Sequence, residues 1–276
     1  MGNFRQKRIA LVNDLTGFGR CSVAVALPII SALKVQCCFL PTAILSNHTG
    51  FDNFFFEDYT PKMREYIENW EKIKLNFDGI CTGFLGSSEQ IDIVMEFLDK
   101  FKKENTLAII DPVMGDYGKL YCTYTDEMCS KMQHLVQYAD VLTPNLTELC
   151  RLLDIAYPSE TPTHKELYSL CETLAQKGPS KIVVTGLQRN GYIENFIFQT
   201  GKPYEIVKVK KVGVDRSGTG DVFTSIVAAS VVKNEDFAES VQKAADFISK
   251  ALAFTTKMNL PTNYGVCFEE FLTELK

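Results

Sequence analysis

DGICTGFLGSSEQIDIVMEFLDKFKKENTLAIIDP, residues 78–112, is the stretch that decides the fold. Its two ends, DGICTGF (78–84) and LAIIDP (107–112), contain short apolar runs, which are typical of strands buried on both faces. Between them, residues 89–103 repeat apolar side chains at helical spacing, which predicts an amphipathic helix. The stretch therefore predicts a strand–helix–strand unit, and such units build parallel sheets.

The remainder of the chain continues this alternation. Two segments, 192–200 and 203–210, alternate apolar with polar side chains, which predicts an antiparallel hairpin at one edge of the sheet. We expect an α/β fold in a single domain, residues 1–276, whose mostly parallel sheet carries helices on both faces. Further strands are predicted at 8–13, 36–45, 139–145 and 181–186. Further helices are predicted within 21–35, at 60–74, at 125–138, around 167–174 with an end at Gly178, at 219–233 and at 236–256.

The composition argues against nucleic acid or a membrane as a partner. The 276 residues are 46% apolar and 23% charged, the formal net charge is -5, and the sequence has no basic tract. No apolar run approaches the roughly 20 residues that cross a bilayer. The first residues, MGNFRQKRIALVN, lack the apolar core and cleavage site of a signal peptide, so we expect a cytoplasmic protein.

The cysteines and histidines give no sign of a structural metal. Nine cysteines, an odd number, are scattered without a C-x-x-C pair, which predicts reduced and mostly buried thiols. Only His48, His134 and His164 could supply imidazoles, so we expect no zinc site. We interpret His134 and His164 as surface or capping residues on their predicted helices.

The tetrapeptide Gly218-Thr219-Gly220-Asp221 opens the predicted helix 219–233. A glycine turn at a helix start presents unpaired backbone N–H groups at the positive end of the helix dipole, which suits an anion. A carboxylate beside those groups is placed to take a proton from an alcohol that attacks a phosphate. The motif predicts phosphoryl transfer with Asp221 as base; the alternative is an ordinary glycine turn followed by an acidic residue.

Polar side chains collect where the predicted strands end. In open parallel sheets, ligands bind beyond the carboxyl ends of the strands, so these side chains are expected to share one rim. They are Asn13, Asp14, Asn47, His48, Thr49, Asp111, Asn145, Glu148, Thr185 and Gly186.

Three of these rim residues form a candidate magnesium site. Asp111 ends a strand, and Asn145 and Glu148 follow the next, so their oxygens could organise a hydrated Mg²⁺ completed by phosphates. The alternative for Asn145 and Glu148 is a capping box, because they stand three positions apart at a helix start.

Several other nucleotide-binding or catalytic motifs are excluded. There is no G-x-x-x-x-G-K-[ST], and Gly17-Phe18-Gly19 is followed by Ser22 where a dinucleotide fingerprint needs glycine. The protein-kinase H-R-D and D-F-G motifs and the G-x-S-x-G elbow are also absent.

SNHTG, TGFLGSSEQ, DPVMGD, TPNLTE and GTGD occur in this order within residues 8–255. This combination resembles the pyridoxal kinases of the ribokinase-like superfamily, most closely bacterial pyridoxal or pyridoxamine kinases. The resemblance implies a three-layer α/β/α kinase domain that forms a homodimer. It also implies transfer of the γ-phosphate of ATP, with Mg²⁺, to the 5′-hydroxymethyl group of pyridoxal, pyridoxamine or pyridoxine in vitamin B6 salvage. It leaves open whether a monovalent cation is needed.

The resemblance further implies roles for the motif residues. Asp221 would be the base, and the amides of Gly218, Thr219 and Gly220 would form the anion hole. Asp111 and Glu148 would hold the metal. The residues that would contact or flank the pyridine ring are Asn13, His48, Thr49 and Phe84. The residues that would lie along ATP are Asp111, Thr143, Asn145, Glu148, Thr185 and Gly186.

Three positions depart from the family pattern or from that of a sister family. Asn13 stands where many members have serine, and an amide can both donate to and accept from a ring nitrogen. Phe84 stands where tyrosine is frequent; it keeps the stacking face without the hydroxyl. Hydroxymethylpyrimidine kinases are similar in the turn after the first strand but commonly carry cysteine where this chain has Asp221.

Two alternative functions remain open from sequence. One is a kinase of hydroxymethylpyrimidine or another small alcohol on the same fold, and the other is a non-catalytic protein that binds a nucleotide or a B6 vitamer. The preferred vitamer and the closure of loops 46–60 and 112–122 are also open. The aromatic segment SNHTGFDNFFFEDY (46–59) is interpreted as a substrate lid or a subunit contact, or as a loop packed on its own core.

Overall fold

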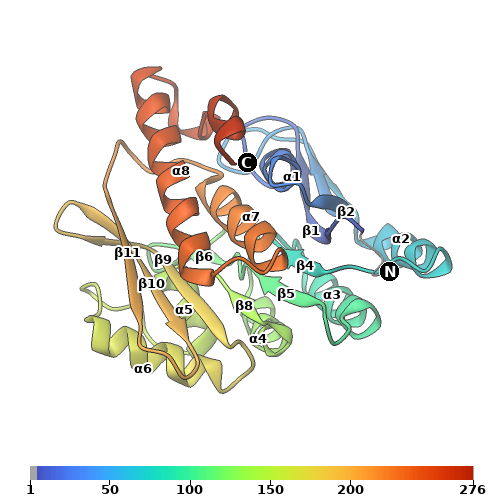
Figure 1. Cartoon of the computed structure of the whole chain (residues 1–276). Coiled ribbons are helices and arrows are strands. Elements are labelled where there is room, and N and C mark those ends of the chain that lie inside the picture. Colours follow the sequence, from blue (N-terminus) through green and yellow to red (C-terminus); the bar gives the residue numbers. More distant parts are fainter. Residues whose placement is uncertain (1–4, 276) are drawn as a thin grey trace.

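The computed structural model describes residues 5–275 and contains a nine-stranded sheet (Figure 1). Its strands are β1 (Arg8–Thr16), β2 (Gln36–Leu45), β3 (Phe56–Asp58), β4 (Gly79–Thr82), β5 (Leu107–Ile110), β8 (Val141–Leu142), β9 (Lys181–Arg189), β10 (Tyr192–Gln199) and β11 (Glu205–Lys210). They follow the order β11-β10-β9-β8-β5-β4-β1-β2-β3. The six strands from β9 to β2 in this order are parallel, whereas β3 at one edge and β10–β11 at the other pair antiparallel. The predicted parallel sheet with an edge hairpin is confirmed.

Helices cover both faces of this sheet. One face packs against α2 (Thr60–Lys72), α3 (Ser88–Phe101), α4 (Asp126–Leu135), α5 (Leu146–Leu153) and α6 (His164–Ala175). The other face packs against α1 (Val23–Ala32), α7 (Thr219–Val232) and α8 (Phe237–Lys257), with the 3₁₀ helix η3 (Glu269–Leu275) beside them. Figure 1 shows α7 and α8 side by side on one face, with α3 to α6 on the opposite side. The three-layer α/β/α architecture is confirmed.

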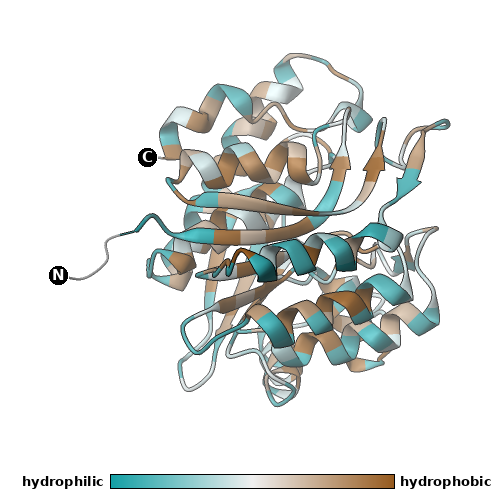
Figure 2. Ribbon diagram, turned by 90° about the vertical axis from the view of Figure 1, so that its right-hand side faces the viewer, coloured by the Kyte–Doolittle hydropathy of each residue, from teal (hydrophilic) through white to brown (hydrophobic). Residues whose placement is uncertain are grey.

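Both faces of the central strands are buried, which explains their continuous apolar runs. In β1, Ile9 and Leu11 belong to the core under α7, while Ala10 and Val12 belong to the core under α3. Helix α7 is buried along residues 222–232, because the sheet lies on one side of it and α8 and α1 lie on the other. Figure 2 shows the same contrast, with apolar strands inside and polar outer helix faces.

Several boundaries differ from the sequence-based prediction. Strand β8 has only two residues, since the chain turns at Pro144 toward α5, and β9 continues past Gly186. The predicted helix 125–138 ends in a separate 3₁₀ turn, Val136–Tyr138. The short strand β3 and the hairpin β6 (Gly115–Asp116) and β7 (Lys119–Leu120) were not predicted, because two or three residues carry no periodicity. Within residues 5–275, no helix combines the length and apolarity that a membrane crossing demands.

Candidate active site

The first turn of α7 is open to a ligand. Gly218 precedes it with φ of 81°, and a Cβ atom there would lie 1.9 Å from the backbone oxygen of Arg20, so only glycine fits. Within residues 5–275, no protein acceptor receives the backbone N–H groups of Thr219, Gly220 or Asp221. A Cβ atom on Gly220 would meet nothing within 4 Å. These amides and the free space before them form a cradle that suits an anion.

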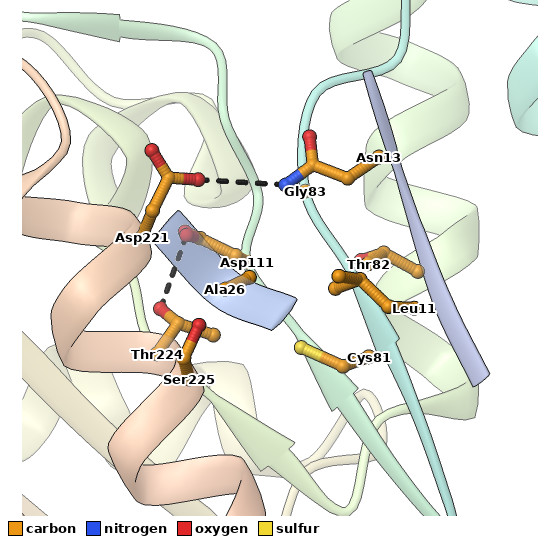
Figure 3. A pocket seen from close by; sticks show the side chains of 10 residues that line it. All are labelled: Leu11, Asn13, Ala26, Cys81, Thr82, Gly83, Asp111, Asp221, Thr224 and Ser225. Carbon is orange, nitrogen blue, oxygen red and sulfur yellow. Dashed lines mark hydrogen bonds between the residues drawn. The ribbon is translucent and has the colours of Figure 1, made fainter. Parts of the chain in front are cut away.

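Asp221 lies in this turn beside a small cavity at the ends of the central strands (Figure 3). Asn13, at a register shift in β1, is 2% exposed and donates from Nδ2 to Asp221 Oδ1 over 3.4 Å. Asp111, which follows β5, lines the same cavity. The residues that line it are Leu11, Asn13, Ala26, Cys81, Thr82, Gly83, Asp111, Asp221, Thr224 and Ser225. The fold therefore brings three rim residues from distant parts of the sequence into one cavity.

The two cavity carboxylates have raised pKa values. Burial, with the negative charge of Asp14, raises the pKa of Asp221 to about 6, while a backbone N–H of Ser22 and the Asn13 amide oppose the rise. Burial raises the pKa of Asp111 too, and the charge of Asp221 adds to the effect. A carboxylate with a pKa near neutrality is suited to general base catalysis.

A chain of hydroxyl groups connects Asp111 to the nucleotide candidates. The Thr224 hydroxyl on α7 donates to Asp111 Oδ2 over 3.1 Å, and it lies 3.0 Å from the hydroxyl of Thr143. Thr143 follows β8 and is 3% exposed. Asp111 is thus held in place by α7, the same helix that carries Asp221.

Asn145 and Glu148 form the capping box at the start of α5. Asn145 Oδ1 accepts from the Glu148 backbone N–H over 3.0 Å, and Glu148 Oε2 accepts from the Asn145 backbone N–H over 2.8 Å. The Asn145 Nδ2 group donates to the Gly115 oxygen at 2.8 Å and to Asp116 at 2.9 Å. The side chain of Asn145 is therefore engaged by protein on both sides, as the capping alternative predicted.

Glu148 is also a buried carboxylate with a raised pKa, as expected for a group that binds a cation. It is 4% exposed, and its Oε1 accepts from the backbone N–H of Met114 over 3.2 Å. Burial and the neighbouring charge of Asp111 hold the pKa of Glu148 well above its usual range. Within residues 5–275, no three His, Cys, Asp or Glu side chains converge to bind a metal by themselves. Asp111 and Glu148 fit Mg²⁺, which takes one or two carboxylates and completes its shell with phosphates and water.

Thr185 and Gly186 lie within β9 rather than after it. Thr185 bridges to Asn145, and its backbone N–H donates to the Pro144 oxygen over 2.9 Å, so these residues continue the strand edge beside α5. Gly186 has φ of 71°, and a Cβ atom there would meet nothing within 4 Å. A bulky ligand could pass close to this backbone.

The predicted acceptor residues occupy two neighbouring loops. His48 Nε2 donates to the Asn263 oxygen over 2.8 Å, and His48 Nδ1 accepts from the Gly50 backbone N–H over 3.1 Å. Both ring nitrogens are engaged by protein, so the imidazole offers a ligand its face. Thr49 is exposed in the same loop. Phe84 is half-buried and joined to Asn13, because its backbone N–H donates to Asn13 Oδ1 over 2.9 Å.

The remaining histidines and the cysteines lie apart from the cavity, with two exceptions. His134 is exposed, as predicted for a surface residue. His164 does not cap α6, since Thr163 does; it pairs with Glu194 over 2.9 Å. Six of the nine cysteines are buried and all nine are free. Cys81 lines the cavity, and Cys21 lies close enough for the charges of Asp221 and Asp14 to act on its pKa.

Two buried side chains at the rim, Asp14 and Thr82, had no predicted role. Asp14 is 4% exposed, accepts from the Thr16 hydroxyl over 2.5 Å, and has a pKa raised by burial. The Thr82 hydroxyl, also buried at the cavity, has no hydrogen-bond partner within residues 5–275. Asp14 was visible at a strand end, but nothing in the sequence separates Thr82 from an ordinary strand threonine.

A C-terminal segment, residues 260–264, was also missed. Its backbone oxygens accept hydrogen bonds from three loops of the rim: from Arg216 at Leu260 and Pro261 (2.9 and 2.8 Å), from His48 at Asn263 (2.8 Å) and from Arg20 at Tyr264 (3.1 Å). The Tyr264 ring lies 4.9 Å from the ring of Phe18, edge to face. These contacts join residues up to 244 positions apart, so no local motif could have revealed them.

The chain is similar in sequence to known kinases. Residues 27–266 match the protein family described as phosphomethylpyrimidine kinase. A pyridoxal kinase of Arabidopsis thaliana is 30% identical over 217 residues, which are 75% of this chain and 67% of that protein.

Solved structures share the whole fold. A crystal structure from Bacteroides thetaiotaomicron, provisionally described as a phosphomethylpyrimidine kinase and solved with pyridoxal, has a TM-score of 0.94 and 37% identity. The match covers 98% of this chain and 96% of that one. Pyridoxal kinase from Lactobacillus plantarum has a TM-score of 0.89 at 24% identity, over 98% of this chain and 96% of its own, and this likeness concerns the fold.

Proposed function

The chain belongs to the phosphomethylpyrimidine kinase family and is an ATP-dependent small-molecule kinase of the pyridoxal kinase type, and on that premise we propose that its acceptor is a B6 vitamer. The transfer would place the γ-phosphoryl group of ATP on the 5′-hydroxymethyl group of pyridoxal, pyridoxamine or pyridoxine. The observation that carries this proposal is the open first turn of α7, with Asp221 beside it in the cavity of Asp111. The pyridoxal in the Bacteroides thetaiotaomicron structure supports the choice of acceptor.

In this mechanism, the amides of Gly218, Thr219 and Gly220 bind the phosphoryl group during transfer and stabilise its charge. Asp221 accepts the proton of the attacking hydroxyl while the new O–P bond forms. Its raised pKa, about 6, leaves it mostly ionised at neutral pH and still basic enough for this task.

The nucleotide is held along the strand ends beside α5. Asp111 and Glu148 would bind Mg²⁺, which neutralises phosphate charge when present. Their mutual repulsion within a buried site supports this role, because a bound cation would relieve it. Thr143 and the backbone at Asn145, Thr185 and Gly186 would line the path of ATP, and the open space at Gly186 supports that placement.

The acceptor ring would lie near His48, Thr49 and Phe84. His48 and Phe84 could contact a pyridine ring with their faces, and the ring of Phe51, 4.8 Å from that of His48, extends this aromatic surface. A planar heteroaromatic alcohol suits such a surface better than a sugar does.

Hydroxymethylpyrimidine is the second candidate acceptor, because the matched family is described as phosphomethylpyrimidine kinase, a name that points to a closely related pyrimidine. The test is to incubate the purified protein with Mg·ATP and one alcohol at a time, and to measure the release of ADP. The alcohols are pyridoxal, pyridoxamine, pyridoxine, hydroxymethylpyrimidine and ribose. We expect the highest kcat/KM with a B6 vitamer, and pyridoxal phosphate is detected independently by its visible absorbance. Preference for hydroxymethylpyrimidine would replace the proposal, and ligand binding without ADP release would identify a non-catalytic binder.

We also propose that two copies associate. Phe54, Phe55 and Phe56 are 42%, 61% and 37% exposed, and β3 leaves a sheet edge beside them. A contiguous set of exposed aromatic side chains at an edge supports a subunit contact. Light scattering should give twice the chain mass, whereas Phe55→Glu should give the monomer mass.

The single domain, the cytoplasmic location and any requirement for a monovalent cation stay predictions.

A further inference from the structure

The orientation of the Asn13 amide is fixed by the backbone around it. Asn13 Oδ1 accepts two hydrogen bonds, from the backbone N–H groups of Asp14 and Phe84, each over 2.9 Å. Because only the carbonyl end of an amide can accept, the Nδ2 end must face the opposite way. It donates to Asp221 Oδ1 over 3.4 Å, and Figure 3 marks this hydrogen bond with a dashed line.

The surroundings of Asn13 leave it little freedom to move. The side chain is 2% exposed and lies against Gly83, where a Cβ atom would sit 2.4 Å from Asn13 Nδ2. Any other residue at 83 would push the amide out of place. The carbonyl oxygen of the amide already accepts two backbone hydrogen bonds, and one of the two N–H groups on Nδ2 is directed at Asp221.

The carboxylate that Asn13 reaches is surrounded by other acidic groups. Asp14 faces it from β1 and Asp111 from the end of β5, and both repel it when ionised. The thiols of Cys21 and Cys81 lie close by, and the Ser22 backbone N–H lies near enough to lower the pKa of Asp221 against the effect of burial. A carboxylate repelled from two sides needs a fixed donor to keep one orientation.

We infer that Asn13 is a positioning residue for Asp221: its Nδ2–H group holds one carboxylate oxygen and leaves the other to take the acceptor's proton. This inference rests on the proposed function. In the step itself, the O–H bond of the alcohol breaks, its proton passes to Asp221, the alcohol oxygen bonds to the γ-phosphorus, and the bond from that phosphorus to the β–γ bridging oxygen breaks to release ADP.

Asn13→Asp is the sharpest test, since it keeps the accepting oxygen for the two backbone amides and replaces the donor with an oxygen that repels Asp221. At pH 8, kcat should fall about 10²-fold, the cost of a small misplacement of a catalytic group, while KM for ATP and for the acceptor stays within about twofold. In an Asp221→Asn background the same change should cost less than about twofold, because residues that act as a unit are not additive. Asn69→Asp, the same change at an exposed amide on α2, is the control and should leave kcat unchanged.

Three results would overturn the inference. The first is an unchanged kcat in Asn13→Asp, and the second is an unchanged kcat with a raised KM for the acceptor in that variant. The third is a further fall of kcat by about 10²-fold when Asn13→Asp is added to Asp221→Asn. If Asn13→Asp does not fold, the same measurements are made on Asn13→Ser, and the same results are expected because a serine hydroxyl is too short to replace the amide. If the wild-type protein phosphorylates none of the alcohols, the proposed function fails by itself. In that case, crystal structures of the wild type and of Asn13→Ser still test whether Asn13 orients Asp221. A rotated Asp221 carboxylate in Asn13→Ser supports the inference, and an unchanged orientation contradicts it.

Discussion

Helices α5 and α7 begin at the same rim of the sheet, yet their first turns are built in opposite ways. At α5, the Asn145 and Glu148 side chains take up the free backbone N–H groups in a reciprocal capping box. At α7, the N-cap is Gly218, which has no side chain to offer, and the space before Gly220 is empty of protein atoms. One helix satisfies its own amides, whereas the other leaves them for a ligand.

The difference shows how the same local chemistry serves stability at one helix and function at the other. Free amides at a helix start cost stability unless something binds them, so a helix that leaves them open in a buried rim is expected to bind an anion there. The acidic residue in each first turn follows the same division. Glu148 bonds the amides of its own cap and of Met114, whereas Asp221 faces the cavity shared with Asn13 and Asp111.

Removing the acid of the open turn should have the largest effect. Asp221→Asn keeps the shape of the side chain but cannot accept the proton, so kcat should fall by about 10²- to 10⁴-fold. Binding of ATP, measured by calorimetry, should persist because the amide cradle is unchanged. Turnover near the wild-type rate would show that another group is the base.

Filling the open turn should have the next largest effect. Gly220→Ala puts a methyl group into the space that the phosphoryl group would occupy, and kcat/KM for ATP should fall by about 10²-fold. Stability should be unchanged or rise by up to about 1 kcal/mol, since alanine is the better helix residue. A variant with wild-type kinetics would mean that the phosphoryl group does not approach this turn.

The pH dependence should follow the ionisation of Asp221. Burial raises its pKa to about 6, and only the ionised form can accept a proton, so kcat/KM should decline as pH falls through about 6. The decline should approach tenfold per pH unit below that value. It should be absent from the residual activity of Asp221→Asn, and its persistence there would assign it to another group.

Removing the capping box at the start of α5 should have the smallest effect of these changes, and the quantity it should change is stability. Asn145→Ala removes the cap of α5, and the free energy of unfolding in urea should fall by about 1 kcal/mol. Thr163→Ala, which breaks the similar capping box of α6 away from the cavity, should lower stability comparably without loss of activity. An Asn145→Ala variant as stable as the wild type would remove the contrast between α5 and α7.

Much of this comparison could be predicted from sequence because its parts are local. The apolar runs of β1, β4 and β5 indicate strands buried on both faces, and the capping box and the glycine turn are short motifs at helix starts. The rule that ligands bind beyond parallel strand ends placed Asn13 and Asp111 at one rim, and the glycine turn marked Asp221; the structure shows that all three share a cavity.

The remainder depends on contacts between distant residues. Asn13 and Asp221 are 208 positions apart, so the orientation of the amide could not be anticipated. Contact between Asn13 and the acceptor ring, which the family resemblance implies, stays a prediction. The hydrogen bonds of Arg216 to residues 260 and 261 are equally invisible, because an isolated arginine in a loop has no characteristic pattern. Strand β3 was not predicted, because its three residues are too few to show an alternation of apolar and polar side chains.

A crystal structure with a non-hydrolysable ATP analogue and pyridoxal would show where the open turn of α7 stands relative to the reacting atoms. We predict that the γ-phosphate accepts hydrogen bonds from the amides at the start of α7, with the 5′-hydroxyl between that phosphate and Asp221. A γ-phosphate bound elsewhere, with the amides of Thr219 and Gly220 facing only water, would contradict it.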